Sequence, residues 1–373
     1  MAGIYIHIPF CKQACHYCDF HFSTSLNKRD AMLGAICKEL ILRKEELTQP
    51  IETIYFGGGT PSLLSPQEID FVLQTVYDNF TIVDTPEITL EANPDDLTDA
   101  KISALASSKI NRLSIGIQSF FEEDLKLMNR AHNQTEALDC IKKAKQYFKN
   151  ISIDLMYGIP QMSPQRWQEN IEKALSLEVP HISCYVLTVE PKTALERFIK
   201  NGIIRPVDDA VAARHHAVLV EKTAAVGYHN YEFSNFCIPG WESQSNSSYW
   251  MRKPYLGVGP SAHSYDVVSR SWNVSNNPRY IKSIEKGVLP LTTEILTTEN
   301  QYNEYIMTRL RTAGGVSIDE IGAFFGLKFQ EYLKQNMQQH IALGLLICEG
   351  DLIKATKKGK FLTDGIAADL FMI

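Results

Sequence analysis

Three cysteines near the N-terminus are the residues whose type and spacing most clearly suggest chemistry. Cys11, Cys15 and Cys18 form a C-x3-C-x2-C cluster. Three thiolates can each hold one iron of a [4Fe–4S] cube and leave the fourth iron open, whereas ordinary electron-transfer clusters take four cysteines. An iron with an open position can bind and act on a small molecule, as an open zinc site does. The spacing therefore predicts a cluster that holds a reactive ligand.

Zinc and disulfide chemistry are the alternatives for these cysteines. Zinc would need a fourth ligand, which His16 or His21 could supply. Disulfides fit poorly, because three close cysteines do not pair off and eight cysteines in 373 residues is a low density. The remaining cysteines are scattered singly, and we expect each to be a small core hydrophobe: Cys37, Cys140, Cys184, Cys237 and Cys348.

The composition is typical of a soluble globular protein with one large domain and a smaller one. Hydrophobic residues make up 45% of the chain and charged residues 21%. The net charge of −6 argues against a general nucleic-acid surface. No apolar run approaches the roughly 18 residues that a membrane span needs. Free thiols and an oxygen-sensitive cluster favour a reducing cytoplasm.

Strand-like and helix-like stretches alternate through the first half of the chain. Runs rich in β-branched and aromatic residues predict strands at 3–8, 52–56, 87–91, 112–118, 152–156 and 181–188. Helical spacing of apolar residues predicts helices at 28–47, 66–80, 98–107, 134–148 and 164–177. This alternation implies a parallel sheet with helical crossovers, either a barrel or an open doubly wound sheet.

The cysteine spacing resembles the radical SAM signature, in which S-adenosylmethionine (SAM) binds the open iron and is cleaved to a 5′-deoxyadenosyl radical. Residues at the carboxyl ends of the strands are placed to hold such a ligand. The glycines at 57–59 have no Cβ, so that backbone can lie against the amino group of SAM. The other expected roles are charge neutralisation of the sulfonium or amino group by Glu91, pairing with the methionyl carboxylate by Arg130, and hydrogen bonds to the ribose from Gln118 and Asp154.

We expect three regions: a barrel core at 1–206, an extension at 207–297 and a small domain at 298–373. In the extension, 208–226 predicts a helix, 228–233 a strand, and 235–275 long ordered loops rich in Gly, Ser, Asn and Pro. In the last region, helices at 299–310, 317–325 and 329–343, then strands at 345–348, 351–353 and 359–362, have the order of a winged-helix module. Its acidic and basic residues nearly balance, which favours a solvated wing over a nucleic-acid contact.

Longer motifs make the resemblance more specific. Nearly end to end, the chain resembles radical SAM proteins of the oxygen-independent coproporphyrinogen III oxidase family. The motifs are Tyr5-Ile-His-Ile-Pro-Phe-Cys11, Gly57-Gly-Gly-Thr-Pro-Ser62, Glu91-Ala-Asn-Pro94, Ser114-Ile-Gly-Ile-Gln-Ser119, Asp154-Leu-Met-Tyr-Gly-Ile-Pro160 and Tyr231-Glu-Phe-Ser-Asn-Phe236. The resemblance implies an α/β fold with a partial (β/α)6 barrel. It also implies SAM contacts at Tyr5, Tyr17, Gly58, Gly59, Thr60, Glu91, Gln118, Arg130, Asp154 and Thr188.

Two features separate the oxidases of this family from its heme-chaperone branch. The oxidases carry a further cysteine two residues after the third, where this chain has Phe20. They also carry a longer N-terminal extension, where this chain has ten residues before Cys11. Both differences favour the chaperone branch.

That branch carries a His-Asn-x-x-Tyr-Trp motif associated with heme binding. Asn246, Tyr249 and Trp250 match it, whereas Ser245 replaces the histidine. A hydroxyl is a poor axial ligand for heme iron, so a histidine elsewhere, such as His263, is a candidate, although internal packing of His263 is the simpler interpretation.

The function that we expect is therefore that of a cytoplasmic heme chaperone with a [4Fe–4S] cluster, SAM and heme as its cofactors. Its expected partners are an electron donor, a hemoprotein acceptor and, transiently, a membrane surface, with no nucleic acid. The alternatives are an oxygen-independent coproporphyrinogen III oxidase and a winged-helix regulator that senses the cluster.

Overall fold

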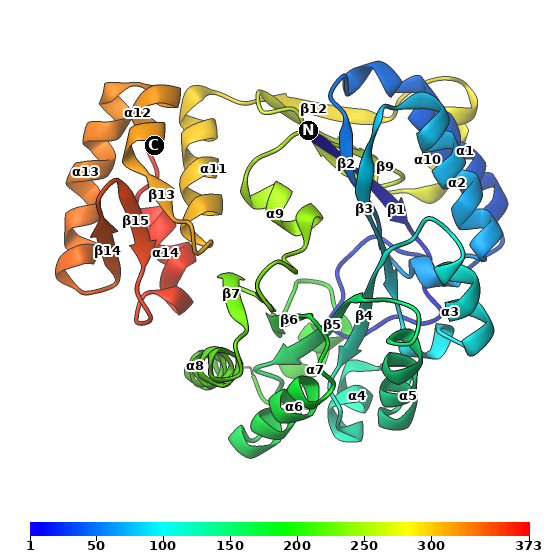
Figure 1. The fold of residues 1–373 in the computed structure, drawn as a ribbon, viewed down its shortest axis with the longest axis horizontal. Coiled ribbons are helices and arrows are strands. Elements are labelled where there is room, and N and C mark those ends of the chain that lie inside the picture. The colour runs from blue at the N-terminus through cyan, green and yellow to red at the C-terminus, as the bar shows by residue number, and fades with distance from the viewer. Residues whose placement is uncertain (207) are drawn as a thin grey trace.

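A computed structural model describes residues 1–206 and 208–373, so the predicted boundary at residue 207 lies outside the described residues (Figure 1). Its main feature is a twelve-stranded sheet in which six central strands run parallel in chain order. These are β1 (Ala2–Ile8), β2 (Ile51–Gly58), β3 (Ile82–Ala92), β4 (Arg112–Gln118), β5 (Asn150–Tyr157) and β6 (His181–Val186). The six predicted strands are confirmed, although the sixth ends at Val186 and not at residue 188.

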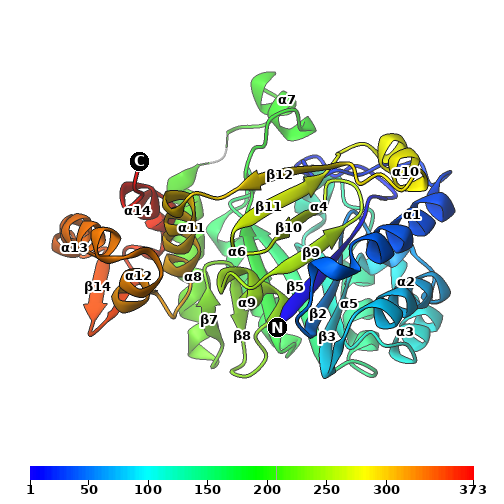
Figure 2. The same ribbon diagram turned by 90° about the horizontal axis from the view of Figure 1, so that it is seen from above.

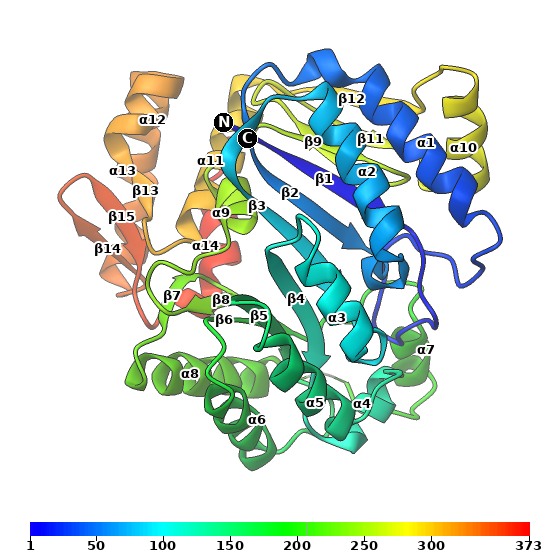
Figure 3. The ribbon, with the colours of Figure 1, turned by 45° about the vertical axis from the view of Figure 1, so that its right-hand side comes forward.

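The crossover helices cover the outer face of these strands, as Figure 3 shows for the first part of the chain. They are α1 (Arg29–Leu42), α2 (Pro66–Asn79), α3 (Asp99–Ala106), α5 (Gln134–Ala144) and α6 (Pro164–Ser176). The prediction of one helix over 28–47 is wrong at its end, because a separate turn follows α1. Short helices missing from the prediction are η1 (Lys44–Glu46), η2 (Pro61–Leu63), η3 (Pro94–Asp96), α4 (Glu122–Met128) and α7 (Ala194–Lys200), and α7 projects from the rest of the fold (Figure 2).

The extension adds strands to both edges of the same sheet. On the β6 edge lie β8 (Asn235–Cys237) and β7 (His229–Glu232), and on the β1 edge lie β9 (Tyr255–Val258), β10 (His263–Tyr265), β11 (Ser269–Asn273) and β12 (Leu291–Ile295). Helices α8 (Asp209–Ala225), α9 (Gln244–Trp250) and α10 (Asn277–Glu285) connect them. The prediction of loops over 235–275 is wrong. The strands there are short, and β9 pairs in parallel with β1, so their stability comes from partners that are distant in sequence.

The C-terminal region has the helix and wing order expected of a winged-helix module. It contains α11 (Thr298–Leu310), α12 (Ile318–Phe325), α13 (Leu327–Ala342), α14 (Thr363–Asp369) and the three-stranded sheet β13 (Val316–Ser317), β15 (Leu352–Ala355), β14 (Leu346–Glu349). A separate hydrophobic core around Tyr302 and Leu333 supports the proposed boundary at 298. The predicted strand at 359–362 is wrong: backbone bonds to Thr356 turn the chain into η4 (Lys360–Leu362), and β13 is the third strand.

Helix α9 lies on the inner side of the sheet, between the strands and the C-terminal region (Figure 1). The buried Glu87 carboxylate on β3 accepts hydrogen bonds from the backbone N–H groups of Gln244 and Ser245, both at 3.0 Å, and so satisfies the first turn of α9. Glu52 at the start of β2 accepts from Ser248 at 3.3 Å. Two acidic side chains at the amino ends of the strands therefore hold α9 in place. Within the described residues, no helix combines the length and apolar character that crossing a membrane requires.

Candidate functional site

One cavity of about 560 Å³ extends from the carboxyl ends of the parallel strands through the barrel interior to α9. It brings together most of the residues that the sequence selected. Those lining it are Cys11, Cys15, Tyr17, Cys18, Gly58, Gly59, Thr60, Glu91, Gln118, Arg130, Asp154, Thr188 and Asn246. Tyr5, Tyr249 and Trp250 do not line it. The hydroxyl of Tyr5 lies 3.2 Å from Nδ1 of His7, and its ring stacks on Tyr55 beside the cavity.

The cysteine loop is closed at its base by backbone hydrogen bonds between Cys11 and Ser23 (3.1 Å) and between Ser23 and Pro9 (2.9 Å). The three thiols are free and partly exposed. Thr60 Oγ1 donates to Cys11 Sγ at 3.4 Å, and Arg130 Nη1 donates to Cys15 Sγ at 3.5 Å. The loop thus presents all three sulfur atoms to one end of the cavity, next to cavity-lining donors.

The three thiols of the loop do not converge on a single point. Among the described residues, no three His, Cys, Asp or Glu side chains are close enough together to hold one metal ion. The ligands of a cube bind separate irons and so do not converge on one point. His16 bonds through Nδ1 to the Leu127 carbonyl (2.8 Å) and His21 through Nε2 to Asn277 Oδ1 (2.7 Å), so one ring nitrogen of each candidate zinc ligand is engaged.

Arg130 links the cysteine loop to two strand ends. Its Nη2 donates to Asn93 Oδ1 and to the Gly116 carbonyl, both at 2.7 Å. Its buried Nε has no hydrogen-bond partner in the part of the chain that the structure describes. A buried donor of this kind is costly unless something accepts from it. The free Nε therefore fits a ligand carboxylate, which is the role predicted for Arg130.

Two partly buried carboxyl groups, Glu91 and Asp154, face the middle of the cavity. Tyr55 donates to Glu91 Oε1 at 2.8 Å, and Ser114 donates to Asp154 Oδ1 at 3.3 Å. Burial raises the pKa of Glu91 from 4.5 to about 7, against the opposing effect of the Tyr55 hydrogen bond. Burial likewise raises the pKa of Asp154 to about 6. A cation bound between them would favour both ionised forms, as the sulfonium and amino groups of SAM would.

Packing within the protein explains why glycine occupies positions 58 and 59, and the sequence did not reveal this cause. A Cβ on Gly58, whose φ is +101°, would lie 2.4 Å from the His7 ring, and a Cβ on Gly59 would lie 2.6 Å from the Phe10 carbonyl oxygen. The chain's own first strand and cysteine loop thus fill the space where a side chain would be. Close packing against this loop, in addition to contact with a ligand, requires glycine here.

The residues of the heme-associated motif are not gathered at one point. Asn246 faces the far end of the main cavity and accepts a hydrogen bond from Trp250 Nε1 at 3.0 Å. Tyr249 packs edge-on against Tyr255, with ring centroids 4.7 Å apart. Ser245, at the position of the motif's histidine, is buried at the start of α9. Its side chain is therefore no exposed iron ligand.

Several cavity residues were missed by the sequence analysis. Arg112, Ser114, His181 and Ser183 line the cavity from β4 and β6. The buried Nε of Arg112 lies 4.0 Å from Glu87 Oε2 and has no hydrogen-bond partner among the described residues. The missed signal is alternation: polar residues occupy every second position of these strands, between buried residues such as Leu113 and Ile182. Side chains at alternate positions share a face, so the polar series marks the barrel interior.

Comparisons with known proteins agree with this geometry. Residues 5–174 match the Radical SAM superfamily, and residues 296–362 match the HemN C-terminal domain. The chain is 34% identical to Heme chaperone HemW of Bacillus subtilis over 97% of both chains. It is 32% identical to Heme chaperone HemW of Lactococcus lactis, again over 97% of both.

The fold is that of coproporphyrinogen III oxidase (HemN) from Escherichia coli, with a TM-score of 0.84 and 22% identity over all of this chain and 90% of that one. The partial radical SAM barrel with its small C-terminal domain, expected from the sequence, is thus confirmed. Full-length similarity at this level shows that the chain belongs to the HemW family of radical SAM proteins.

Proposed function

We propose that this protein is a heme chaperone that binds a [4Fe–4S] cluster and SAM, takes up heme and delivers it to a hemoprotein acceptor. The observation that carries the proposal is the gathering of three free thiols and two partly buried carboxyl groups on one cavity. It occurs in a chain whose full-length relatives are named heme chaperones.

The cavity residues divide into those for the cluster and those for its ligand. Cys11, Cys15 and Cys18 would hold three irons, and the fourth would be open to SAM. Arg130 would hold the methionyl carboxylate through its free Nε, and Glu91 would face the positive charge of the ligand. Gln118 and Asp154 would accept from or donate to the ribose hydroxyls. When bound, the cluster and SAM would together supply the reductive cleavage of a carbon–sulfur bond.

Phe20 distinguishes the chaperone from the oxidase within a fold that both share. It occupies the position at which the oxidases are expected to have a fourth cysteine, lines the cavity and is 67% exposed. An aromatic side chain at the cavity mouth provides a contact surface for a flat macrocycle and no thiol for chemistry. We therefore place oxidation of coproporphyrinogen III second. The shared fold with HemN keeps it as a specific alternative.

One anaerobic experiment separates the two functions. Protein with a reconstituted cluster and SAM is given an electron donor and coproporphyrinogen III, and in parallel is titrated with heme. The proposal expects saturable heme binding, transfer of that heme to an apo-hemoprotein, and no protoporphyrinogen IX. Catalytic formation of protoporphyrinogen IX would place the oxidase first, and absence of heme binding would refute the chaperone.

A further inference from the structure

An exposed histidine lies beside a tryptophan on the β1 edge of the large sheet. His263 on β10 and Trp272 on β11 are directly opposite in the antiparallel pair, and their rings stack with centroids 5.9 Å apart and planes 25° apart. Among the histidines of the described chain, only His263 and His229 are exposed. The expectation that His263 packs internally is therefore wrong.

The position of this pair relates it to the cysteine loop. Strand β9 runs parallel to β1, so the turn that follows β9 and leads to His263 lies at the same end of the sheet as the loop after β1. Gly259 in that turn packs so closely on β1 that a Cβ would lie 2.5 Å from the His7 carbonyl oxygen. The histidine thus starts its strand beside the chain that leads into the cluster-binding loop.

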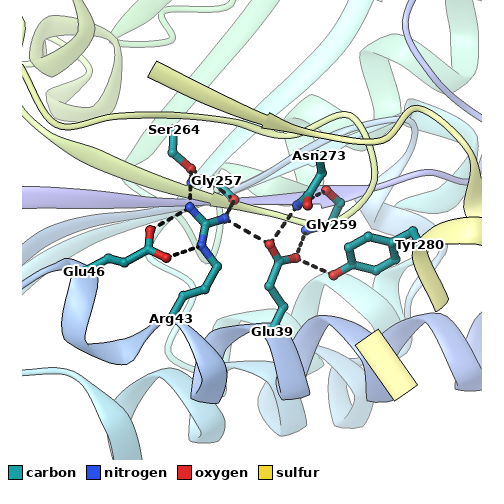
Figure 4. Close-up of polar contacts among 8 residues, drawn as sticks. All are labelled: Glu39, Arg43, Glu46, Gly257, Gly259, Ser264, Asn273 and Tyr280. Carbon is teal, nitrogen blue, oxygen red and sulfur yellow. Dashed lines mark hydrogen bonds and ion pairs between the residues drawn. The ribbon is translucent and has the colours of Figure 1, made fainter. Parts of the chain in front are cut away.

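The neighbours of the pair show which way it points. Ser264 and Asn273, each adjacent in sequence to one member, are buried and bonded to α1 on the outer face of the sheet (Figure 4). Arg43 Nη2 donates to Ser264 Oγ at 3.1 Å, and Asn273 Nδ2 donates to Glu39 Oε1 at 2.7 Å. Successive side chains of a strand point to opposite faces. His263 and Trp272 therefore point to the inner face, the side on which α9 lies.

The bonds behind the pair form a buried and well-satisfied network. Glu39 is fully buried and accepts from Arg43 Nη1 (2.9 Å), the Gly259 N–H (2.9 Å) and the Tyr280 hydroxyl (2.5 Å), as well as from Asn273 (Figure 4). Arg43 also donates to the Gly257 carbonyl at 2.9 Å. The network holds the backbone of β9, β10 and β11 at points that flank the pair. A ligand site is more precise when its supporting residues are fixed in this way.

An aromatic strip joins the pair to the heme-associated motif on α9. The ring of Tyr249 packs on Tyr255 (4.7 Å), and Tyr255 lies 6.3 Å from Tyr265 on the same strand face as His263. Arg252, two residues after the motif, donates through Nε to the Tyr265 hydroxyl at 3.0 Å, and its Nη2 has no partner among the described residues. Aromatic rings beside a cation match a flat, apolar macrocycle that carries carboxylates.

We propose that His263 is the axial ligand of heme iron in this protein, with Trp272 packed beside the macrocycle. This inference rests on the proposed chaperone function and supplies the imidazole that Ser245 cannot. Partial burial and the positive charge of Arg270 lower the pKa of His263, which favours the neutral ring that binds metals.

The test compares heme titrations of the full-length, cluster-loaded protein and two single variants, followed by the Soret band and by electron paramagnetic resonance of ferric heme. His263→Ala is expected to weaken heme affinity at least tenfold and to abolish the histidine-ligated spectrum. Added imidazole should restore that spectrum in this variant. His229→Ala is the matched control, since it removes the other exposed histidine, and it should bind heme like the wild type. Iron content and circular dichroism confirm that the variants are folded.

The outcomes separate this inference from the function on which it rests. Wild-type protein that binds no heme would refute both. Wild-type binding that is unchanged in affinity and spectrum in His263→Ala would overturn only the assignment of the ligand. An equal loss of heme affinity in His229→Ala and in His263→Ala would also overturn the assignment of the ligand, because the effect would then not be specific to His263.

Discussion

Removal of the Glu91 charge gives a quantitative test of the cavity. Raising the pKa of this buried carboxyl from 4.5 to about 7 corresponds to about 3 kcal/mol against its ionised form in the empty protein. A bound cation offsets that cost only when Glu91 is ionised. If SAM binds the ionised form alone, the titration of Glu91 should weaken its affinity about tenfold at pH 6 relative to pH 8, with about a further twofold from Asp154, and the affinity should level off above pH 8.

Glu91→Gln isolates this effect, because glutamine keeps the shape of the side chain and its contact with Tyr55. The variant should bind SAM more weakly than the wild type at pH 8, and its affinity should change only about twofold between pH 6 and pH 8, from the remaining titration of Asp154. Anaerobic equilibrium binding of labelled SAM to the cluster-loaded protein measures both quantities. A variant that retained the tenfold pH dependence would refute the reasoning.

The stability of the ligand-free protein should show the opposite trend with pH. Between about pH 4.5 and pH 7, the folded protein keeps a proton on Glu91 that the unfolded chain has lost. The folded state therefore binds more protons in this window, and its stability falls as pH rises. Thermal unfolding should show a smaller fall in Glu91→Gln than in the wild type, and equal slopes would contradict the buried, protonated carboxyl.

Three further changes test the cluster, the glycine packing and the buried network. Replacing Cys11, Cys15 or Cys18 by Ala should each abolish the iron chromophore, whereas Cys348→Ala should retain about four irons, and tight zinc uptake without iron would argue against the cube. Gly59→Ala should lower stability by about 1–3 kcal/mol and reduce cluster retention, because its Cβ meets backbone at 2.6 Å. A Cβ added at Gly34 in α1 would have no atom within 4 Å, so Gly34→Ala should stabilise the protein by about 0.5–1 kcal/mol. Urea titration measures the stability of both glycine variants. Glu39→Gln should cost about 3 kcal/mol, because it removes the fully buried carboxylate of the Arg43 ion pair and leaves only Glu46 to neutralise Arg43. Glu46→Gln, at the partly exposed end of the same network, should cost under about 1 kcal/mol, and equal losses in both would show that burial does not set the cost.

The sequence alone determined the central part of the fold and indicated most of the residues that line the cysteine end of the cavity. Strands β1 to β6 are long, apolar runs separated by helical patterns, so their existence and parallel order follow from local periodicity. Residues that end these strands, such as Glu91 and Gln118, necessarily meet at one rim, because parallel strands share a direction. The cysteine spacing is also a local pattern, and it indicated a [4Fe–4S] cluster without knowledge of the fold.

Only the tertiary structure decided which other residues share that site and which way they face. Strands β9 to β11 have three to five residues each, and the pairing of β9 with β1 brings together residues some 250 positions apart, which no local pattern encodes. His263 is exposed because its neighbour Ser264 accepts a hydrogen bond from the buried Arg43, which directly follows α1. A contact on one face of the sheet thus sets the direction of the side chain on the other. The acidic residues that hold α9, and the glycine that packs on Phe10, likewise depend on distant backbone. Local sequence specifies an element and its periodicity, whereas the partners that orient short strands and buried charges exist only once the chain has folded.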